Sequence, residues 1–97
     1  MTRALITTVP FGEVDPAPLR LLDEAGIEHV INPVGRPLAE EELGSLIPGF
    51  DVLIAGTEPV TERVMEAAPE LRLISRVGVG LDNVDLLAAR RRGITVA

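Results

Sequence analysis

An arginine followed by a glycine-rich stretch is the feature of this sequence best suited to bind a ligand. Residues 76–83 read RVGVGLDN. Because glycine has no Cβ, backbone N–H groups in such a loop can converge on an anion, and a helix that follows adds its positive end. Arg76 could pair with the same anion. The pattern indicates a site for a carboxylate or a phosphate, with the alternative that Gly78 and Gly80 only permit a tight turn.

Five other polar residues have simpler interpretations. Thr57 could donate its hydroxyl to a ligand, or it could belong to an ordinary T-x-P turn. Glu58 is expected to be a solvated loop acid rather than a catalytic base, because no neighbour in sequence suits it to that chemistry. Asp82 or Asn83 is expected to cap the helix that follows. His29 lies within a predicted strand, away from these loops, and is expected to be structural.

The glycines also match the start of a dinucleotide-binding fingerprint, G-x-G-x-x-G, but the match is incomplete. Its third glycine is replaced by Asn83, and no acidic partner for a ribose follows before the sequence ends. We therefore expect no cofactor site in this chain.

The composition excludes several other classes of function. The chain has 97 residues, 46% of them apolar, and a net charge of −6, with acids and arginines interspersed. This predicts one packed domain that binds neither nucleic acid nor membrane. The absence of cysteine and lysine excludes thiol nucleophiles, thiolate metal sites and Schiff-base chemistry. The first apolar run is too short for a secretory or membrane segment, so a cytoplasmic location is expected.

Short apolar runs alternate with helical patterns along the whole chain. The runs predict strands over 4–9, 27–31, 50–55, 71–75 and 94–96, and helices over 16–25, 38–47, 61–68 and 82–93. This alternation predicts an α/β fold with a parallel five-stranded sheet and helices on both faces, in the flavodoxin-like order 2-1-3-4-5. A Rossmann half-sheet of order 3-2-1-4-5 is the alternative. In either case the loops 9–13, 56–59 and 76–83 follow the carboxyl ends of strands, where ligands bind in such sheets.

Two segments resemble D-isomer-specific 2-hydroxyacid dehydrogenases of the phosphoglycerate dehydrogenase type. They are LRLISRVGVGLDNVDLLAARRRGITV at 71–96 and GTEPVTERVMEAAP at 56–69. The resemblance implies that the backbone N–H groups of Val77 and Gly78 hold the carboxylate of a small 2-hydroxy or 2-oxo acid, with Arg76 beside them. It also implies a separate Rossmann domain for NAD or NADP, and catalytic Arg, Glu and His residues that have no counterpart here.

The resemblance has limits that shape the expected function. Residues 1–50 agree with the family only in pattern, and the sequence stops within the predicted fifth strand. We therefore expect residues 1–97 to be a substrate-binding fragment, truncated before the nucleotide domain and inactive alone. Phosphoglycerate dehydrogenases commonly carry an arginine where this chain has Ala55 and Gly56, which argues against a phosphorylated substrate. The alternative is a free-standing flavodoxin-like ligand-binding or interaction domain without catalysis.

The predicted topology also suggests self-association. Right-handed crossovers put the first helix on one face and the other three on the opposite face. The face with one helix is expected to leave apolar residues of strands three to five exposed and to form a homodimer; these residues are Val52, Leu53, Ile54, Leu73, Ile74, Ile94 and Val96.

Overall fold

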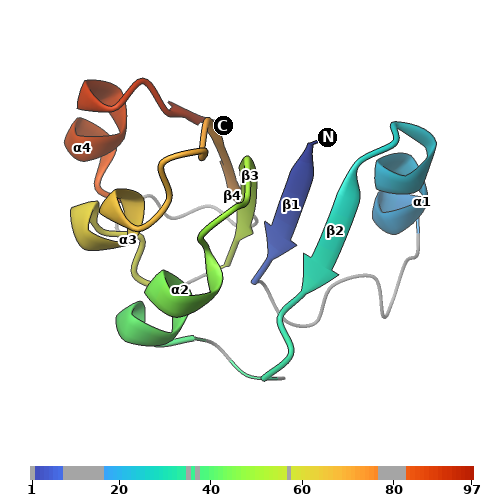
Figure 1. Ribbon diagram of the computed structural model, residues 1–97, viewed down its shortest axis with the longest axis horizontal. Helices are drawn as coiled ribbons and strands as arrows, with labels where there is room; N and C mark the ends of the chain where they lie inside the picture. The colour runs from blue at the N-terminus through green and yellow to red at the C-terminus, as the bar shows by residue number, and fades with distance from the viewer. Residues whose placement is uncertain (1, 8–16, 35, 37, 57, 77–82) are drawn as a thin grey trace.

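Five short strands pair in parallel in the computed structural model of this protein and form one sheet (Figure 1). The structure describes residues 2–7, 17–34, 36, 38–56, 58–76 and 83–97. The strand order is β2-β1-β3-β4-β5, which confirms the flavodoxin-like prediction. The elements along the chain are β1 (Arg3–Ile6), α1 (Ala17–Glu24), β2 (Glu28–Ile31), α2 (Glu40–Leu46), β3 (Val52–Ala55), α3 (Glu62–Glu66), β4 (Leu73–Arg76), α4 (Leu86–Arg91) and β5 (Thr95–Val96).

The core lies between one face of the sheet and the three helices α2, α3 and α4. Leu5, Leu53 and Ile74 are aligned across β1, β3 and β4, and all three are buried. Because side chains alternate along a strand, the three leave the sheet on the same face. Helix residues such as Leu43 and Val64 are buried in the same cluster and close the core from the other side.

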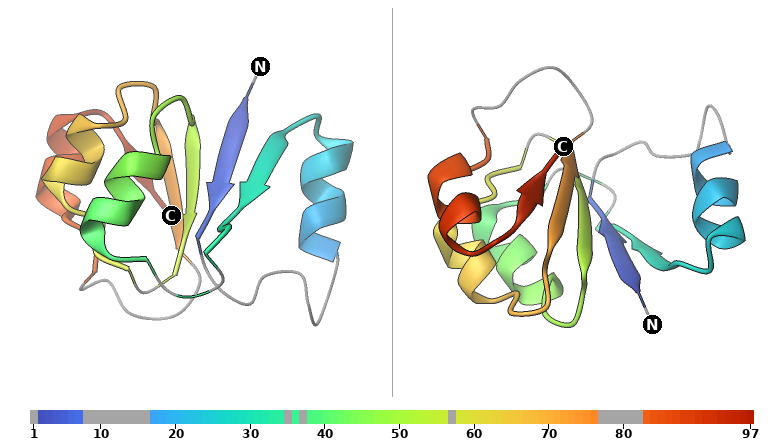
Figure 2. Two further views of the ribbon diagram at one scale, coloured as in Figure 1. Left: turned by 60° about the horizontal axis from the view of Figure 1, so that its bottom comes forward. Right: turned by 90° about the horizontal axis from the view of Figure 1, so that it is seen from above.

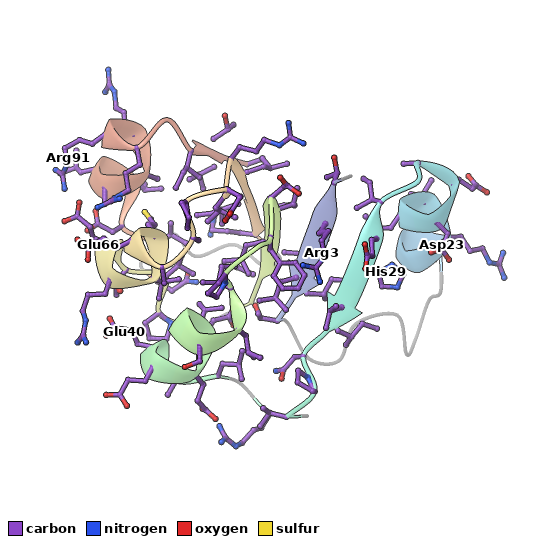
Figure 3. All side chains as sticks on the ribbon, viewed as in Figure 1. Arg3, Asp23, His29, Glu40, Glu66 and Arg91 are labelled. Carbon is purple, nitrogen blue, oxygen red and sulfur yellow. The ribbon has the colours of Figure 1, made fainter. Side chains whose placement is uncertain are left out.

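Helix α1 lies apart from the other three helices, beside the edge strand β2 (Figure 2). The imidazole Nδ1 of His29 on β2 is 3.7 Å from a carboxylate oxygen of Asp23 on α1, and Figure 3 shows the two side chains close together. His29 thus links β2 to α1. Gly26 has a φ of 71° just after the helix, a left-handed conformation that glycine adopts without steric cost, and it ends α1.

The expectation of an exposed apolar face is partly wrong. Leu53, Ile74 and Ile94 are 0%, 0% and 6% exposed, because they point toward α2, α3 and α4. Val96 is partly buried and packs against the same core. Val52, Ile54 and Leu73 alternate with these residues, point to the opposite face and are half-buried.

The start of α4 differs from the sequence-based expectation. The N-cap is Asp85, whose carboxylate accepts a hydrogen bond of 3.0 Å from the backbone N–H of Ala88. The expectation that Asn83 caps this helix is wrong, and Asp82 lies outside the described residues. The first helical residue is Leu86, a few positions later than predicted.

Backbone hydrogen bonds join all five strands at the edge where their amino ends lie, which we call the amino edge. The N–H of Asp51 donates to the oxygen of Arg3 at 2.9 Å, and the N–H of Arg72 donates to the oxygen of Asp51 at 2.9 Å. The N–H of Glu28 donates to Thr2 on one side, and that of Thr95 donates to Arg72 on the other. The Arg3 guanidinium, labelled in Figure 3, also lies 4.5 Å from the centroid of the Phe50 ring.

No helix among the described residues is long and apolar enough to cross a membrane.

Candidate functional site

Polar side chains follow four neighbouring strands at the opposite edge of the sheet, which we call the carboxyl edge. In the order of the sheet they are Asn32 after β2, Thr7 after β1, Glu58 after β3 and Asn83 after β4. Hydrogen bonds connect each of them to the next, and we refer to the four as the carboxyl-edge network. Ligands of open α/β sheets bind at this edge.

Glu58 is the buried acid of the network. The residue is 3% exposed, so the expectation of a solvated loop acid is wrong. The carboxylate accepts a hydrogen bond from the Thr7 hydroxyl and another, at 3.0 Å, from the backbone N–H of Gly56. Two donors aimed at one carboxylate oxygen offset part of the cost of burying the group.

Asn83 joins the segment before α4 to the connection between β3 and α3. Its side-chain amide donates to the backbone oxygens of Gly56 and Glu58 at 2.9 and 3.0 Å. The backbone continues the same contact, because the N–H of Val60 donates to the oxygen of Asn83 at 2.7 Å. Val60 and Val84 then form an isolated parallel bridge. Asn83 is therefore a clamp between two loops rather than a helix cap.

Asn32 and Thr7 complete the network on the β2 side. The Asn32 amide donates to the backbone oxygen of Arg36 at 2.7 Å and, more weakly, to that of Thr7 at 3.4 Å. Its side-chain oxygen accepts from the N–H of Val34 at 2.8 Å and forms the turn after β2. The sequence analysis missed both residues; a polar residue directly after an apolar strand is the only local signal for either.

Arg76 is the candidate site residue that the structure describes most fully. It ends β4 and pairs with Ala55 of β3. The residue is half-buried, and its side-chain Nε is buried without a hydrogen-bond partner among the described residues. A buried donor without an acceptor is costly, so this guanidinium is suited to receive an anion.

Both ends of the predicted anion loop are held beside the same segment. Residues 77–82 lie outside the described residues, and so do the predicted site residues Val77, Gly78 and Thr57. Arg76, just before the loop, is paired with Ala55, and Asn83, just after it, is bonded to Gly56 and Glu58. The two residues that flank the loop therefore both contact the segment after β3, at Ala55, Gly56 and Glu58.

Three further arginines form ion pairs on the surface of the helices. Arg91 on α4 pairs with Glu62 on α3 at 3.0 Å, and Arg92, which caps the end of α4, pairs with Glu66 on α3 at 3.4 Å. Figure 3 shows Arg91 and Glu66 on these neighbouring helices. Arg63 lies 3.6 Å from Glu40.

Arg36 and Glu42 form an exposed ion pair that shifts the pKa of both side chains. The two side chains are 2.7 Å apart. The hydrogen bond from Arg36, with a second one from the backbone N–H of Ala39, lowers the pKa of Glu42 to about 2. The carboxylate of Glu42 in turn raises the pKa of Arg36.

The described residues do not fit a nicotinamide dinucleotide or a metal. In the dinucleotide fingerprint the third glycine allows close packing at the start of the helix, but here the Asn83 side chain lies there, bonded to Gly56 and Glu58. The helix begins only at Leu86, so its amino end does not directly follow the glycines. Among the described residues no group of three or more His, Asp or Glu side chains could hold a metal ion.

Comparisons with known proteins identify relatives. Residues 5–97 match the profile of the catalytic domain of D-isomer specific 2-hydroxyacid dehydrogenases. D-3-phosphoglycerate dehydrogenase of Methanocaldococcus jannaschii is 41% identical over 80 residues, 80% of this chain and 14% of that protein. Hydroxypyruvate reductase of Thermotoga maritima is 42% identical over 60 residues, 61% of this chain and 20% of that protein.

A solved structure shares the fold. The crystal structure of NAD+-bound 3-phosphoglycerate dehydrogenase from Entamoeba histolytica matches with a TM-score of 0.84 and 27% identity, over 98% of this chain and 32% of that one. The chain thus spans between about a seventh and a third of the lengths of these relatives.

Proposed function

We propose a substrate-holding role for this chain, which belongs to the D-isomer specific 2-hydroxyacid dehydrogenase family. In this proposal the chain binds the carboxylate of a small 2-hydroxy or 2-oxo acid at the carboxyl edge of its sheet. Hydride exchange with NAD or NADP belongs to a larger protein that includes a nucleotide-binding domain.

The observation that carries the proposal is the state of Arg76. Its Nε is buried and has no hydrogen-bond partner among the described residues, at the strand end where the glycine-rich loop begins. A carboxylate bound there would give this donor an acceptor. The neighbouring loop, through Val77 and Gly78, would add backbone N–H groups, as the family resemblance implies.

The role of the chain in the reaction is to fix geometry. A carboxylate held between an arginine and backbone amides leaves its C2 atom in one orientation relative to the rest of the cleft. The pairing of Arg76 with Ala55 holds one end of the loop, and the hydrogen bonds of Asn83 to Gly56 and Glu58 hold the other. The described residues include no general acid or base placed to move the proton of a hydroxyl group, so proton transfer is assigned to the larger protein.

Titration of the chain with pyruvate tests the proposal. Amide resonances of Arg76 and Asn83 are expected to shift with a dissociation constant on the order of millimolar, since one half of a cleft leaves the anion partly hydrated. Arg76→Gln is expected to weaken binding about tenfold. Arg90→Gln, on the exposed end of α4, is the charge-matched control and should leave binding unchanged. Shifts that survive Arg76→Gln would contradict the role of this arginine.

A further inference from the structure

The relatives leave the charge of the substrate open, because one acts on a phosphorylated acid by name and another on hydroxypyruvate. We infer that the site on this chain selects unphosphorylated monocarboxylic 2-hydroxy or 2-oxo acids, and that Glu58 is the residue that rejects a second anionic group. The inference rests on the proposed function and adds the substrate class to it.

The first support is the number of cations at the carboxyl edge. Two arginines belong to strand ends or their connections there, Arg36 after β2 and Arg76 at the end of β4. Arg36 is paired with Glu42 at 2.7 Å. Arg76 has no carboxylate within 4 Å among the described residues. Its single positive charge matches one carboxylate.

The segments outside the described residues cannot add a cation to this edge. Residues 8–16, 57 and 77–82 include no arginine, lysine or histidine. They do include the acids Glu13, Asp15 and Asp82. These segments therefore add no cationic side chain that could compete with Arg76 for a ligand.

The second support is the position of Glu58. Its carboxylate is sealed from solvent and forms no ion pair with an arginine of the described chain, so its charge is not cancelled locally. Its segment adjoins both ends of the anion loop, through Asn83 on one side and the pairing of Ala55 with Arg76 on the other. Charges in a region shielded from water act over longer distances than on the surface.

The charges of Arg76 and Glu58 discriminate between substrates that carry one negative group and substrates that carry two. A phosphomonoester adds about −1.5 to −2 charges to a carboxylic acid at pH 7. The carboxylate itself is compensated by Arg76, whereas the phosphoryl group would find no second cation and would be repelled by Glu58. A hydroxyl group in the same position would be tolerated because it carries no charge.

The test compares D-glycerate with 3-phospho-D-glycerate, two acids that differ only in the phosphoryl group. The 97-residue chain is titrated with each at pH 7 in a phosphate-free buffer, following the amide resonances of Arg76, Gly56 and Asn83. We expect glycerate to bind at least about threefold more tightly. Glu58→Gln keeps the size of the side chain and removes its charge, and it should shift the ratio of the two dissociation constants about fivefold toward the phosphorylated acid.

Glu70→Gln is the matched control, because Glu70 is exposed and precedes β4 at the amino edge. It changes the net charge by the same amount and should leave the ratio unchanged. If Glu58→Gln does not fold, the wild-type chain still tests the inference. Added potassium chloride should bring the dissociation constants for the two acids closer together, because salt screens the repulsion of the phosphoryl group.

The outcomes separate this inference from the proposed function. If neither acid shifts the amides of Arg76 and Asn83, or if Arg76→Gln leaves both affinities unchanged, the carboxylate site itself is wrong. If both acids bind through Arg76 but the phosphorylated one binds as tightly or more tightly, only the selection is wrong. A ratio that does not respond to Glu58→Gln would remove Glu58 from the explanation.

Discussion

The hydroxyl of Thr7 donates a hydrogen bond to the carboxylate of Glu58, 51 residues further along the chain, and both side chains are buried. The same hydroxyl lies 3.3 Å from the backbone oxygen of Ile54. Because a hydroxyl has one proton, it can donate to only one of these acceptors at a time. The contact with Glu58 joins the end of β1 to the connection after β3.

Replacing Thr7 with valine is expected to destabilise the fold. The substitution keeps the shape of the side chain but leaves the buried carboxylate of Glu58 without one of its donors, at a cost of about 1–3 kcal/mol. Thr7→Ser keeps the hydroxyl and should cost less. Urea unfolding of the two variants measures the difference, and equal stabilities would show that the hydrogen bond contributes nothing.

Replacing Asn83 with aspartate removes a donor without changing size. The backbone oxygens of Gly56 and Glu58 would face a carboxylate in place of an amide, so we expect a loss of about 2 kcal/mol or more. Hydrogen exchange of the Val60 amide should become faster, because this amide donates to the backbone oxygen of Asn83. Unchanged exchange at Val60, with unchanged stability, would contradict the clamp.

The ion pair of Arg36 and Glu42 is expected to make the stability of the fold depend on pH. The pKa of Glu42 falls from 4.5 to about 2 in the folded chain. A lowered pKa in the fold means that the pair stabilises the fold above about pH 4.5, and that this contribution is lost as the pH falls from 4.5 toward 2. Carboxyl NMR should give a midpoint near 2 for Glu42 in the native chain. Arg36→Gln should move the midpoint upward; a midpoint that stays in place would show that Arg36 is not the cause.

Self-association through the sheet face opposite α2, α3 and α4 is a further prediction. Val52, Ile54 and Leu73 are half-buried on this face, and none of these three helices covers it. Covering apolar surface favours pairing of two copies. Sedimentation equilibrium at micromolar concentration is expected to show a dimer, and Ile54→Glu should shift it to monomer. Leu21→Glu, on the exposed side of α1, should not. A monomeric native chain would refute the prediction.

The isolated chain is predicted to bind no NAD and to oxidise no 2-hydroxy acid. Calorimetric titration should give no binding heat, since the Asn83 side chain lies where the dinucleotide fingerprint has its third glycine. Asn83→Gly supplies the third glycine of the fingerprint. This variant is still expected to bind no NAD, because α4 begins only at Leu86. Binding in the micromolar range by either chain would overturn the assignment of the cofactor to another domain.

The fold could be predicted from the sequence because its signals are local. Apolar runs that end at glycine or proline separate strands from helices, and the handedness of the crossovers limits the possible orders. The exposed face was predicted less well. The prediction counted whole strands as exposed, although successive side chains of a strand point to opposite faces of the sheet. Leu53 and Ile74 therefore point into the core, while Ile54 points to the other face.

The site was harder to predict because its contacts are distant in sequence. Arg76 could be placed at the end of a strand from the pattern alone, and the structure confirms that position. The burial of Glu58 depends on Thr7, and nothing near Glu58 in sequence indicates that contact. The prediction that Asn83 caps the helix was wrong because Asp85 is also a suitable cap and lies closer to the helix.

The loops beyond the carboxyl edge are joined differently from the strands themselves, and this affects how the protein can diverge. Backbone hydrogen bonds link neighbouring strands at both edges, as from Arg72 to Asp51 and from Thr7 to Ile54, and almost any residue can supply these. The loops beyond the carboxyl edge are in addition joined by the side chains of Thr7, Glu58 and Asn83, which depend on residue type. Substitutions of these side chains can therefore alter the ligand-facing loops while the backbone hydrogen bonds preserve the strand order, so that new specificities can evolve without a change of fold.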